Sequence, residues 1–243
     1  ETKNAEFDRS IAIYSHQLDK KVDHWLAEPL ARIDGDLTFK SAQKARMKET
    51  AYTEFIQRVQ MTTMNADISA TSLFNNEGHG FENPITMRNI MTNYVYPDGL
   101  ALELVTGKDL KAALEKAATY FTLNLNNQII VNPAFYSPKL RHYNYDMYEG
   151  INYRINVAKP VGHRIDKLLF KGQPVTDDQI FRLVLNRYRA GGGGHYDMFR
   201  ADKIIAENKT PMSQLIADYL RAHSVVKATV DDNFEVVNEP DTK

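Results

Sequence analysis

Residues 180–196 read IFRLVLNRYRAGGGGHY, and this stretch joins a strand pattern to four consecutive glycines, Gly191 to Gly194. Ile180–Leu185 is predicted to be a strand, because a short apolar run bounded by turn residues is typical of one. Glycine adopts positive φ and lets other groups approach the backbone, so this run indicates a flexible linker, a phosphate cradle or a tight turn beside a ligand. Neither Gly-x4-Gly-Lys-[Ser/Thr] nor a helix-opening G-x-G-x-x-G occurs, since His195-Tyr196 stands where Lys-Ser would be required. The phosphate cradle is therefore disfavoured, and the linker and the turn stay open.

The composition restricts the class of protein. The 243 residues are 43% apolar, which is enough to bury one large core or two small ones. The formal net charge of −1 argues against a DNA- or RNA-binding protein, because such proteins usually carry a basic stripe. The absence of cysteine excludes a disulfide framework and a thiolate metal site, and it suits cytoplasmic and exported bacterial proteins alike. No membrane-spanning apolar run or signal-peptide pattern occurs, and the polar start ETKNAEFDRS is interpreted as the edge of a longer protein.

Four segments have the periodicity or the end signals of helices. The first is expected to stop before Glu28-Pro29, because proline disfavours helix in the residue before it. The second covers about residues 42–59. The third starts at Thr106, which can cap a helix that has Asp109 three residues on, and the fourth starts at Thr210-Pro211. Their apolar faces are Phe7, Ile11, Tyr14, Leu18 and Val22; Ala45, Tyr52, Phe55, Ile56 and Val59; Leu110, Ala113, Leu114, Ala117 and Phe121; and Met212, Leu215, Ile216, Tyr219 and Leu220.

Further apolar runs predict strands, and two polar stretches predict loops. The strands are expected at Leu100–Val105, Ile151–Val157, Ile165–Phe170 and Ile180–Leu185, with an edge strand at Phe234–Val237. Residues 74–84 are a polar loop, and residues 122–148 are Asn-, Tyr- and Pro-rich without periodicity, so a long ordered loop is expected there. The pattern predicts an α+β fold, a mixed sheet with flanking helices, preceded by a helical segment.

Residues that would form a catalytic or metal centre are not visible. The seven histidines form neither H-x-x-x-H nor H-E-x-x-H, and Gly78-His79-Gly80 lacks partner ligands, so solvent or loop positions are expected for them. A nucleophilic triad has no support beyond isolated serines. We therefore expect no metal site and no catalytic residue in this chain.

Two tyrosine-bearing stretches indicate a binding site instead. Tyr96, within Tyr94–Asp98, precedes the strand at residue 100, and Tyr188 lies just before the glycines. Side chains at such junctions project from a rigid edge, so two facing rings can sandwich a flat heterocycle. Stacking of a base on an aromatic ring contributes about 1–3 kcal/mol and tolerates different bases. The alternative is that these tyrosines are ordinary residues at the rim of the core.

Three stretches resemble the C-terminal domain of the 5′-nucleotidase family. They are YVYPDGLALELVTGKDLKAALEKAA (residues 94–118), YEGINYRINVAKPVGHRI (148–165) and LNRYRAGGGG (185–194). Their order and spacing match the family's first aromatic loop, strand and helix, its strand pair, and its closing glycine loop. The resemblance is closest to bacterial 2′,3′-cyclic-nucleotide 2′-phosphodiesterase/3′-nucleotidases and covers about residues 25–238.

The resemblance implies a two-domain, exported hydrolase. In this family, an N-terminal metallophosphoesterase domain holds two divalent metal ions, and the C-terminal domain holds the base and rotates about an interdomain helix. This chain resembles part of that helix at residues 1–24 and the nucleotide-binding domain at residues 25–238, followed by a tail at 239–243. The resemblance therefore places the metal-holding domain outside this chain.

The resemblance also implies which residues bind the nucleotide. The base sandwich falls on Tyr96 and Tyr188, and Asp98 stands near the base edge, where an acid would prefer a ring N–H or an amino group. Gly192 and Gly193 match the family's paired glycines, where a Cβ would crowd the nucleotide or the loop. Asn144 and Asp146 are further candidates.

Several positions depart from the plain 5′-nucleotidases. Gly194 replaces an acidic residue, and Ser72–Asn76 (SLFNN) lacks the arginine of the family's Gly-Gly-x-Arg loop. The change at Gly194 implies that any ribose or base contact of the acidic residue is lost. The missing arginine puts a phosphate-side arginine in doubt and favours the cyclic-nucleotide branch, whose loop also carries phenylalanine. Arg88 is expected to form a structural ion pair and not to bind phosphate.

Three functional hypotheses follow from these residues and the resemblance. The first is the nucleotide-binding domain of an exported bacterial phosphoesterase, periplasmic or cell-wall-associated, which partners its own metallophosphoesterase domain and is inactive alone. The second is a cell-surface scaffold that has lost nucleotide recognition, suggested by the irregular loops at 74–84 and 122–148. The third, a free-standing enzyme, would require phosphate release by this chain alone with added Mn²⁺ or Zn²⁺, and we expect none.

Overall fold

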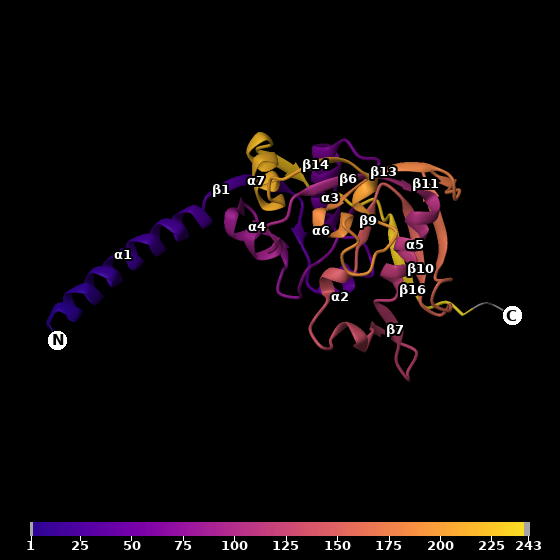
Figure 1. Ribbon diagram of the computed structural model, residues 1–243, viewed down its shortest axis with the longest axis horizontal. Helices are drawn as coiled ribbons and strands as arrows, with labels where there is room; N and C mark the ends of the chain where they lie inside the picture. The colour runs from indigo at the N-terminus through magenta and orange to yellow at the C-terminus, as the bar shows by residue number, and fades with distance from the viewer. Residues whose placement is uncertain (1, 241–243) are drawn as a thin grey trace.

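The computed structural model describes residues 2–240, with side chains from residue 8 onward. Helix α1 (Thr2–Leu26) projects from the body of the molecule as a long rod (Figure 1) and ends before Glu28-Pro29, as predicted. The side chains of its apolar face, Ile11, Tyr14, Leu18 and Val22, are 44% to 69% exposed, while that of Phe7 lies outside the described residues. Domain boundaries at residues 24 and 238 stay predictions, and residues 241–243 of the predicted tail lie outside the described part.

A five-stranded mixed sheet lies at the centre of the body. Its order is β14 (Ile204–Asn208), β6 (Leu100–Thr106), β13 (Ile180–Asn186), β3 (Ile68–Thr71) and β9 (Met147–Glu149). The strands predicted near residues 100 and 180 are confirmed, and they pair antiparallel, with Leu100 opposite Asn186. Because the first residue of β6 faces the last of β13, the segment that enters β6 and the segment that leaves β13 lie side by side. This register brings the two tyrosine-bearing stretches together.

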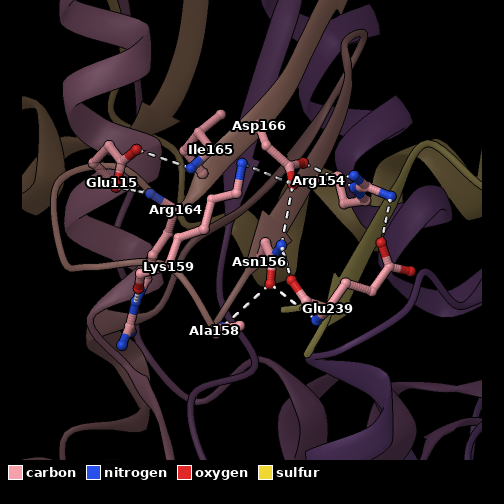
Figure 2. Close-up of polar contacts among 9 residues, drawn as sticks. All are labelled: Glu115, Arg154, Asn156, Ala158, Lys159, Arg164, Ile165, Asp166 and Glu239. Atoms are coloured by element: carbon pink, nitrogen blue, oxygen red, sulfur yellow. Dashed lines mark hydrogen bonds and ion pairs between the residues drawn. The ribbon is translucent and has the colours of Figure 1, made fainter. Parts of the chain in front are cut away.

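A four-stranded sheet packs beside the central one (Figure 1) and confirms three further strand predictions. Its order is β12 (Gln173–Pro174), β11 (Ile165–Phe170), β10 (Asn152–Asn156) and β16 (Phe234–Val237). Figure 2 shows the polar contacts that fix it: Arg154 forms an ion pair with Asp166 at 2.8 Å and with Glu239 at 3.1 Å. The carboxylate of Glu115 accepts the backbone N–H groups of Arg164 and Ile165. These contacts attach the segment after β16 and the helix that carries Glu115 to this sheet.

The remaining strands within residues 2–240 form three smaller sheets. They are β15 (Val225–Lys227) with β1 (Pro29–Asp34) and β5 (Ile85–Thr86); β2 (Leu37–Thr38) with β4 (Gly80–Phe81); and β7 (Phe121–Leu123) with β8 (Ile129–Val131).

The prediction of one continuous loop at residues 122–148 is wrong in part. The β7–β8 hairpin, two 3₁₀ turns (Pro133–Phe135 and His142–Asn144) and the start of β9 fall there. The side chain of Asn124 accepts the backbone N–H groups of Asn126 and Gln128, which closes the hairpin turn. Three-residue strands contain too little alternation for a sequence pattern to show them.

The helices beyond α1 are α2 (Ala42–Ala45), α3 (Ala51–Met64), α4 (Met87–Asn93), α5 (Gly107–Ala118), α6 (Arg187–Ala190) and α7 (Met212–Ala222). The single helix predicted over 42–59 is wrong, because Lys48 forms a β-bridge with Glu235 and Thr50 caps a new helix with a capping box. The predicted cap of Thr106 on α5 is confirmed, with the reciprocal bond to Asp109. Pro211 occupies the N-cap position of α7 and not the first helical position.

The predicted fold class is confirmed, although the strands form several sheets and not one. Buried residues of α3, α5, α7 and the central sheet make a continuous hydrophobic core. None of the helices within residues 2–240 has the length and hydrophobicity that a membrane-spanning segment requires.

Candidate functional site

An open cavity of about 440 Å³ lies where β6 begins and β13 ends. Four chain segments bring side chains to it, and most of these side chains are aromatic. The lining residues are Phe74, Tyr94, Tyr96, Pro97, Asp98, Lys139, Tyr143, Asn186 and Tyr188. A concave, mainly aromatic site with few polar groups is typical of a small-molecule site.

Tyr96 and Tyr188 form two walls of this cavity, and Tyr143 lies between them. The walls are 46% and 53% exposed, so both rings are available to a ligand. The Tyr143 ring centroid lies 6.4 Å from that of Tyr96 and 6.5 Å from that of Tyr188, with interplanar angles of 75° and 72°. A ring that stands edge-on to both neighbours makes a floor between two walls. Phe74, which also lines the cavity, packs edge-on against Tyr96 with ring centroids 5.1 Å apart.

The Asp98 carboxylate holds the walls together. Its Oδ1 accepts the backbone N–H of Gly99 and its Oδ2 accepts that of Tyr188, both at 2.9 Å. The contact of Asp98 with a ring N–H or amino group of the base stays a prediction, since each oxygen accepts one backbone N–H group and keeps a second lone pair. The structure gives Asp98 a positioning role at the cavity rim.

A buried ion pair lies behind the floor. Arg189 is 1% exposed and Asp146 is 2% exposed, and the Arg189 Nε lies 2.6 Å from the Asp146 Oδ2. The same guanidinium donates to the carbonyl of Tyr143 at 2.9 Å and to the carbonyl of Gly193, and it lies 4.0 Å from the Tyr196 ring centroid. Burial by itself would lower the pKa of Arg189, but the Asp146 carboxylate outweighs it and the pKa is raised. Through these hydrogen bonds Arg189 connects Tyr143, the floor residue, to the glycine loop.

Asn144 and Asp146 are not among the cavity-lining residues. Asp146 accepts from Arg189 and from the Ser72 hydroxyl at 2.6 Å. The side chain of Asn144 accepts from Arg189 at 3.1 Å and donates to the Gly194 carbonyl at 3.1 Å. Both side chains are buried and pair within the chain, so they support the site from behind, and a contact of either with a nucleotide stays a prediction.

The glycine run is an ordered turn, which excludes the flexible linker. A Cβ on Gly193 would lie 2.6 Å from two atoms of the Tyr188 ring, so only glycine lets that ring occupy its place. Gly194 has φ +75°, and a Cβ there would overlap Asn144 and Arg189. Gly192, the other glycine of the predicted pair, has φ +81° and lies near the Phe199 carbonyl, whereas a Cβ on Gly191 would make only ordinary van der Waals contacts, the nearest at 3.7 Å. The requirement for glycine therefore covers residues 192–194.

The loop that carries Phe74 is fixed by an arginine from elsewhere in the chain. The Arg46 guanidinium donates to the carbonyls of Leu73 and Asn75 at 2.8 and 2.7 Å and to the side chain of Asn76 at 2.7 Å. Arg88 forms the ion pair predicted for it, with Asp23 of α1 at 3.0 Å.

His142 departs from the solvent or loop positions expected for the histidines. It is buried, its Nδ1 lies 2.6 Å from the Tyr120 hydroxyl, and its Nε2 lies 3.2 Å from the Asn76 amide. Burial and the nearby Arg46 lower its pKa. His142 therefore links the floor segment to the Phe74 loop as a neutral ring.

An acidic cluster lies apart from the cavity lining. Oxygens of Glu49, Glu149 and Asp231 lie within 4.8 Å of one another, although these residues are far apart in the sequence. The Glu49 Oε2 accepts the backbone N–H of Asp231 at 3.0 Å, and the Glu149 Oε1 accepts that of Gly150 at 3.0 Å. Burial, together with the Asp231 charge, raises the pKa of both glutamates. This cluster has no signal in the sequence, because no short-range spacing connects its members.

Several cavity residues were not predicted from the sequence. Lys139 and Tyr143 lie in the segment that was predicted to be a long ordered loop, and Asn186 ends a strand. The concentration of tyrosine at residues 136–148 was the available signal. Only the fold brings that segment between the two walls.

Comparison with known proteins reveals a consistent set of relatives. The family model described as 5′-nucleotidase, C-terminal domain, matches residues 29–201. A 2′,3′-cyclic-nucleotide 2′-phosphodiesterase/3′-nucleotidase from Yersinia enterocolitica is 30% identical over 174 residues, 63% of this chain and 26% of that protein. The trifunctional nucleotide phosphoesterase protein YfkN from Bacillus subtilis is 28% identical over 168 residues, 63% of this chain and 11% of that protein.

A solved structure has the same fold over nearly the whole chain. A Staphylococcus aureus protein described as a 5′-nucleotidase, in complex with alpha-ketoglutarate, superposes with a TM-score of 0.86 and 31% identity. The match covers 92% of this chain and 43% of that one. The present chain thus spans less than half the length of each of these three proteins.

Proposed function

Because this chain belongs to the 5′-nucleotidase C-terminal domain family, we propose that it binds the base of a nucleotide between Tyr96 and Tyr188. The observation that carries the proposal is the arrangement of the rings: two half-exposed walls on either side of the edge-on Tyr143. Base–aromatic stacking contributes about 1–3 kcal/mol per base, so this pocket would bind nucleosides weakly and with broad tolerance.

In the whole protein, the bound nucleotide would be presented to a metallophosphoesterase domain, as a 2′,3′-cyclic-nucleotide 2′-phosphodiesterase or a 3′- or 5′-nucleotidase. The residues that line the cavity do not fit a two-metal centre, because Asp98 is their one carboxylate and both its oxygens accept backbone N–H groups. The 243-residue chain alone would therefore bind nucleotides without hydrolysing them. Incubation with 3′-AMP and Mn²⁺ or Zn²⁺ tests this, and phosphate release by the pure chain would contradict it.

The stacking site is tested by titrating adenosine and 3′-AMP while aromatic NMR shifts of the chain are followed. Saturable ring-current shifts are expected, and they should disappear in Tyr96→Ala and Tyr188→Ala. Tyr14→Ala is the matched control, because Tyr14 is 69% exposed but lies on α1, away from the cavity. An unchanged affinity in Tyr188→Ala would overturn the sandwich.

The absence of any shift at millimolar nucleoside would favour the second hypothesis, a cell-surface scaffold without nucleotide recognition. Export of the protein from the bacterial cytoplasm stays part of the proposal. Its support is the family resemblance, and fractionation of cells that produce the natural protein would test it.

A further inference from the structure

The polar groups of the cavity include both hydrogen-bond donors and acceptors. Its lining contains one basic side chain, Lys139, one amide, Asn186, and one carboxylate, Asp98, besides the tyrosines. The hydrogen bonds already made within the chain decide which of these groups a ligand can use.

Lys139 has its ammonium group available. The Nζ lies 5.8 Å from the centroid of the Tyr143 ring, over the floor between the walls. Within the described residues it makes no ion pair and no hydrogen bond, and its side chain is exposed. An ammonium group has three donors and no acceptor.

Asn186 contributes a second donor. Its Oδ1 accepts the backbone N–H of Arg189 at 2.8 Å and so caps α6. With the oxygen committed to the helix, the Nδ2 is the part of this amide that a ligand can reach, and it has no hydrogen-bond partner among residues 2–240.

The acceptors in the lining are less available than these two donors. Each oxygen of Asp98 already takes one backbone N–H group, and Tyr94 is buried. A carbonyl oxygen at the base edge would accept from Lys139 and Asn186, whereas an exocyclic amino group at the same place would face them donor to donor.

We propose that Lys139 and Asn186 are specificity-determining residues that select bases with a carbonyl at purine C6 or pyrimidine C4 (hypoxanthine, guanine and uracil) over adenine and cytosine, which carry an amino group there. This inference depends on the proposed function, because it assumes that the base lies between Tyr96 and Tyr188. It assigns a substrate class to a cavity that stacking alone would leave permissive.

The decisive pairs of ligands are inosine with adenosine and uridine with cytidine, which differ in one exocyclic group and in the proton on the ring nitrogen beside it. Calorimetric titration of the 243-residue chain should give affinities about five- to tenfold higher for inosine and uridine. In Lys139→Met that preference should fall to about twofold or less, because the charged donor is gone while the stem remains. Lys139→Arg should restore it.

Two further variants separate the donor effect from general damage to the site. Asn186→Asp keeps an oxygen for the α6 cap and removes the amide donor, so it should also reduce the preference for inosine. Lys171→Met is the matched control, since Lys171 likewise lies over an aromatic ring, that of Phe170, but away from the cavity. It should leave the preference unchanged.

The possible failures are distinguishable. If adenosine binds as tightly as inosine, and Tyr188→Ala weakens the binding of both, the proposed base selection is overturned while the proposed stacking site is supported. If no nucleoside binds, both the base selection and the proposed nucleotide-binding function are overturned. A preference for inosine that survives both Lys139→Met and Asn186→Asp would assign the selection to other groups and overturn the roles of these two residues.

Discussion

The carboxylate of Asp98 accepts the backbone N–H of Tyr188 at 2.9 Å, so the residue two positions after one aromatic wall holds the other in place. These residues are ninety positions apart in the chain. The β6–β13 register brings them together, and the hydrogen bond sets the loops that carry the rings.

Asp98→Ala is expected to weaken nucleoside binding about tenfold, because Tyr188 loses the acceptor that orders its backbone. NMR titration measures the affinity, and the shifts of the Tyr188 ring report its mobility. Asp202→Ala is the control, since Asp202 forms an exposed pair with Arg200. An unchanged affinity in Asp98→Ala would show that this bond does not position the wall.

Gly193→Ala should abolish most nucleoside binding, because the added Cβ would collide with the Tyr188 ring at 2.6 Å and push it from the wall. The collision should also destabilise the fold by about 1–3 kcal/mol. Gly191→Ala is the matched control in the same run, where the nearest atom lies 3.7 Å from the added Cβ. Equal behaviour of the two variants in binding and in urea unfolding would contradict the close approach.

Asp146→Asn should lower the free energy of unfolding by about 3–5 kcal/mol, because it leaves the buried guanidinium of Arg189 without its counter-charge. Chemical denaturation measures the loss. Glu207→Gln breaks the exposed pair with Arg187 and should leave the free energy of unfolding nearly unchanged, because solvent screens this pair. Comparable losses in both variants would mean that the buried pair has no special role in the support of the site.

The pH dependence of stability should include a contribution from Glu103 of β6. Glu103 is completely buried, and burial raises its pKa to about 8. Between about pH 5 and pH 8 the folded state keeps a proton that the unfolded state has released, so the free energy of unfolding falls as pH rises through this window.

The glutamine of Glu103→Gln does not titrate. The difference in the free energy of unfolding between this variant and the wild type should therefore shift in favour of the variant by on the order of 1–3 kcal/mol between about pH 5 and pH 8. Urea unfolding across this range measures the difference. The contributions of other titrating groups to the pH dependence cancel, because both proteins contain these groups. Glu82→Gln, at an exposed position, should follow the wild type. A parallel pH profile for Glu103→Gln would show that Glu103 titrates normally.

Much of the fold could be predicted wherever a signal is local. The capping box at Thr106 and Asp109 and the apolar runs of β6, β11 and β13 were recognisable, because each depends on residues within one turn or one strand. The break between α2 and α3 was not, since it depends on a bridge from Lys48 to Glu235 at the other end of the chain.

The sequence by itself determined the family, the strands that carry the two tyrosines and the glycines that follow them, because these are contiguous patterns. Only the tertiary structure decided that Tyr143 is the floor, that Asp98 bonds the chain, and that Asn144 and Asp146 lie behind the site with Arg189. The physical reason is that hydrogen bonds and ring contacts between segments forty to ninety residues apart depend on packing and register. No local spacing of residues encodes these contacts.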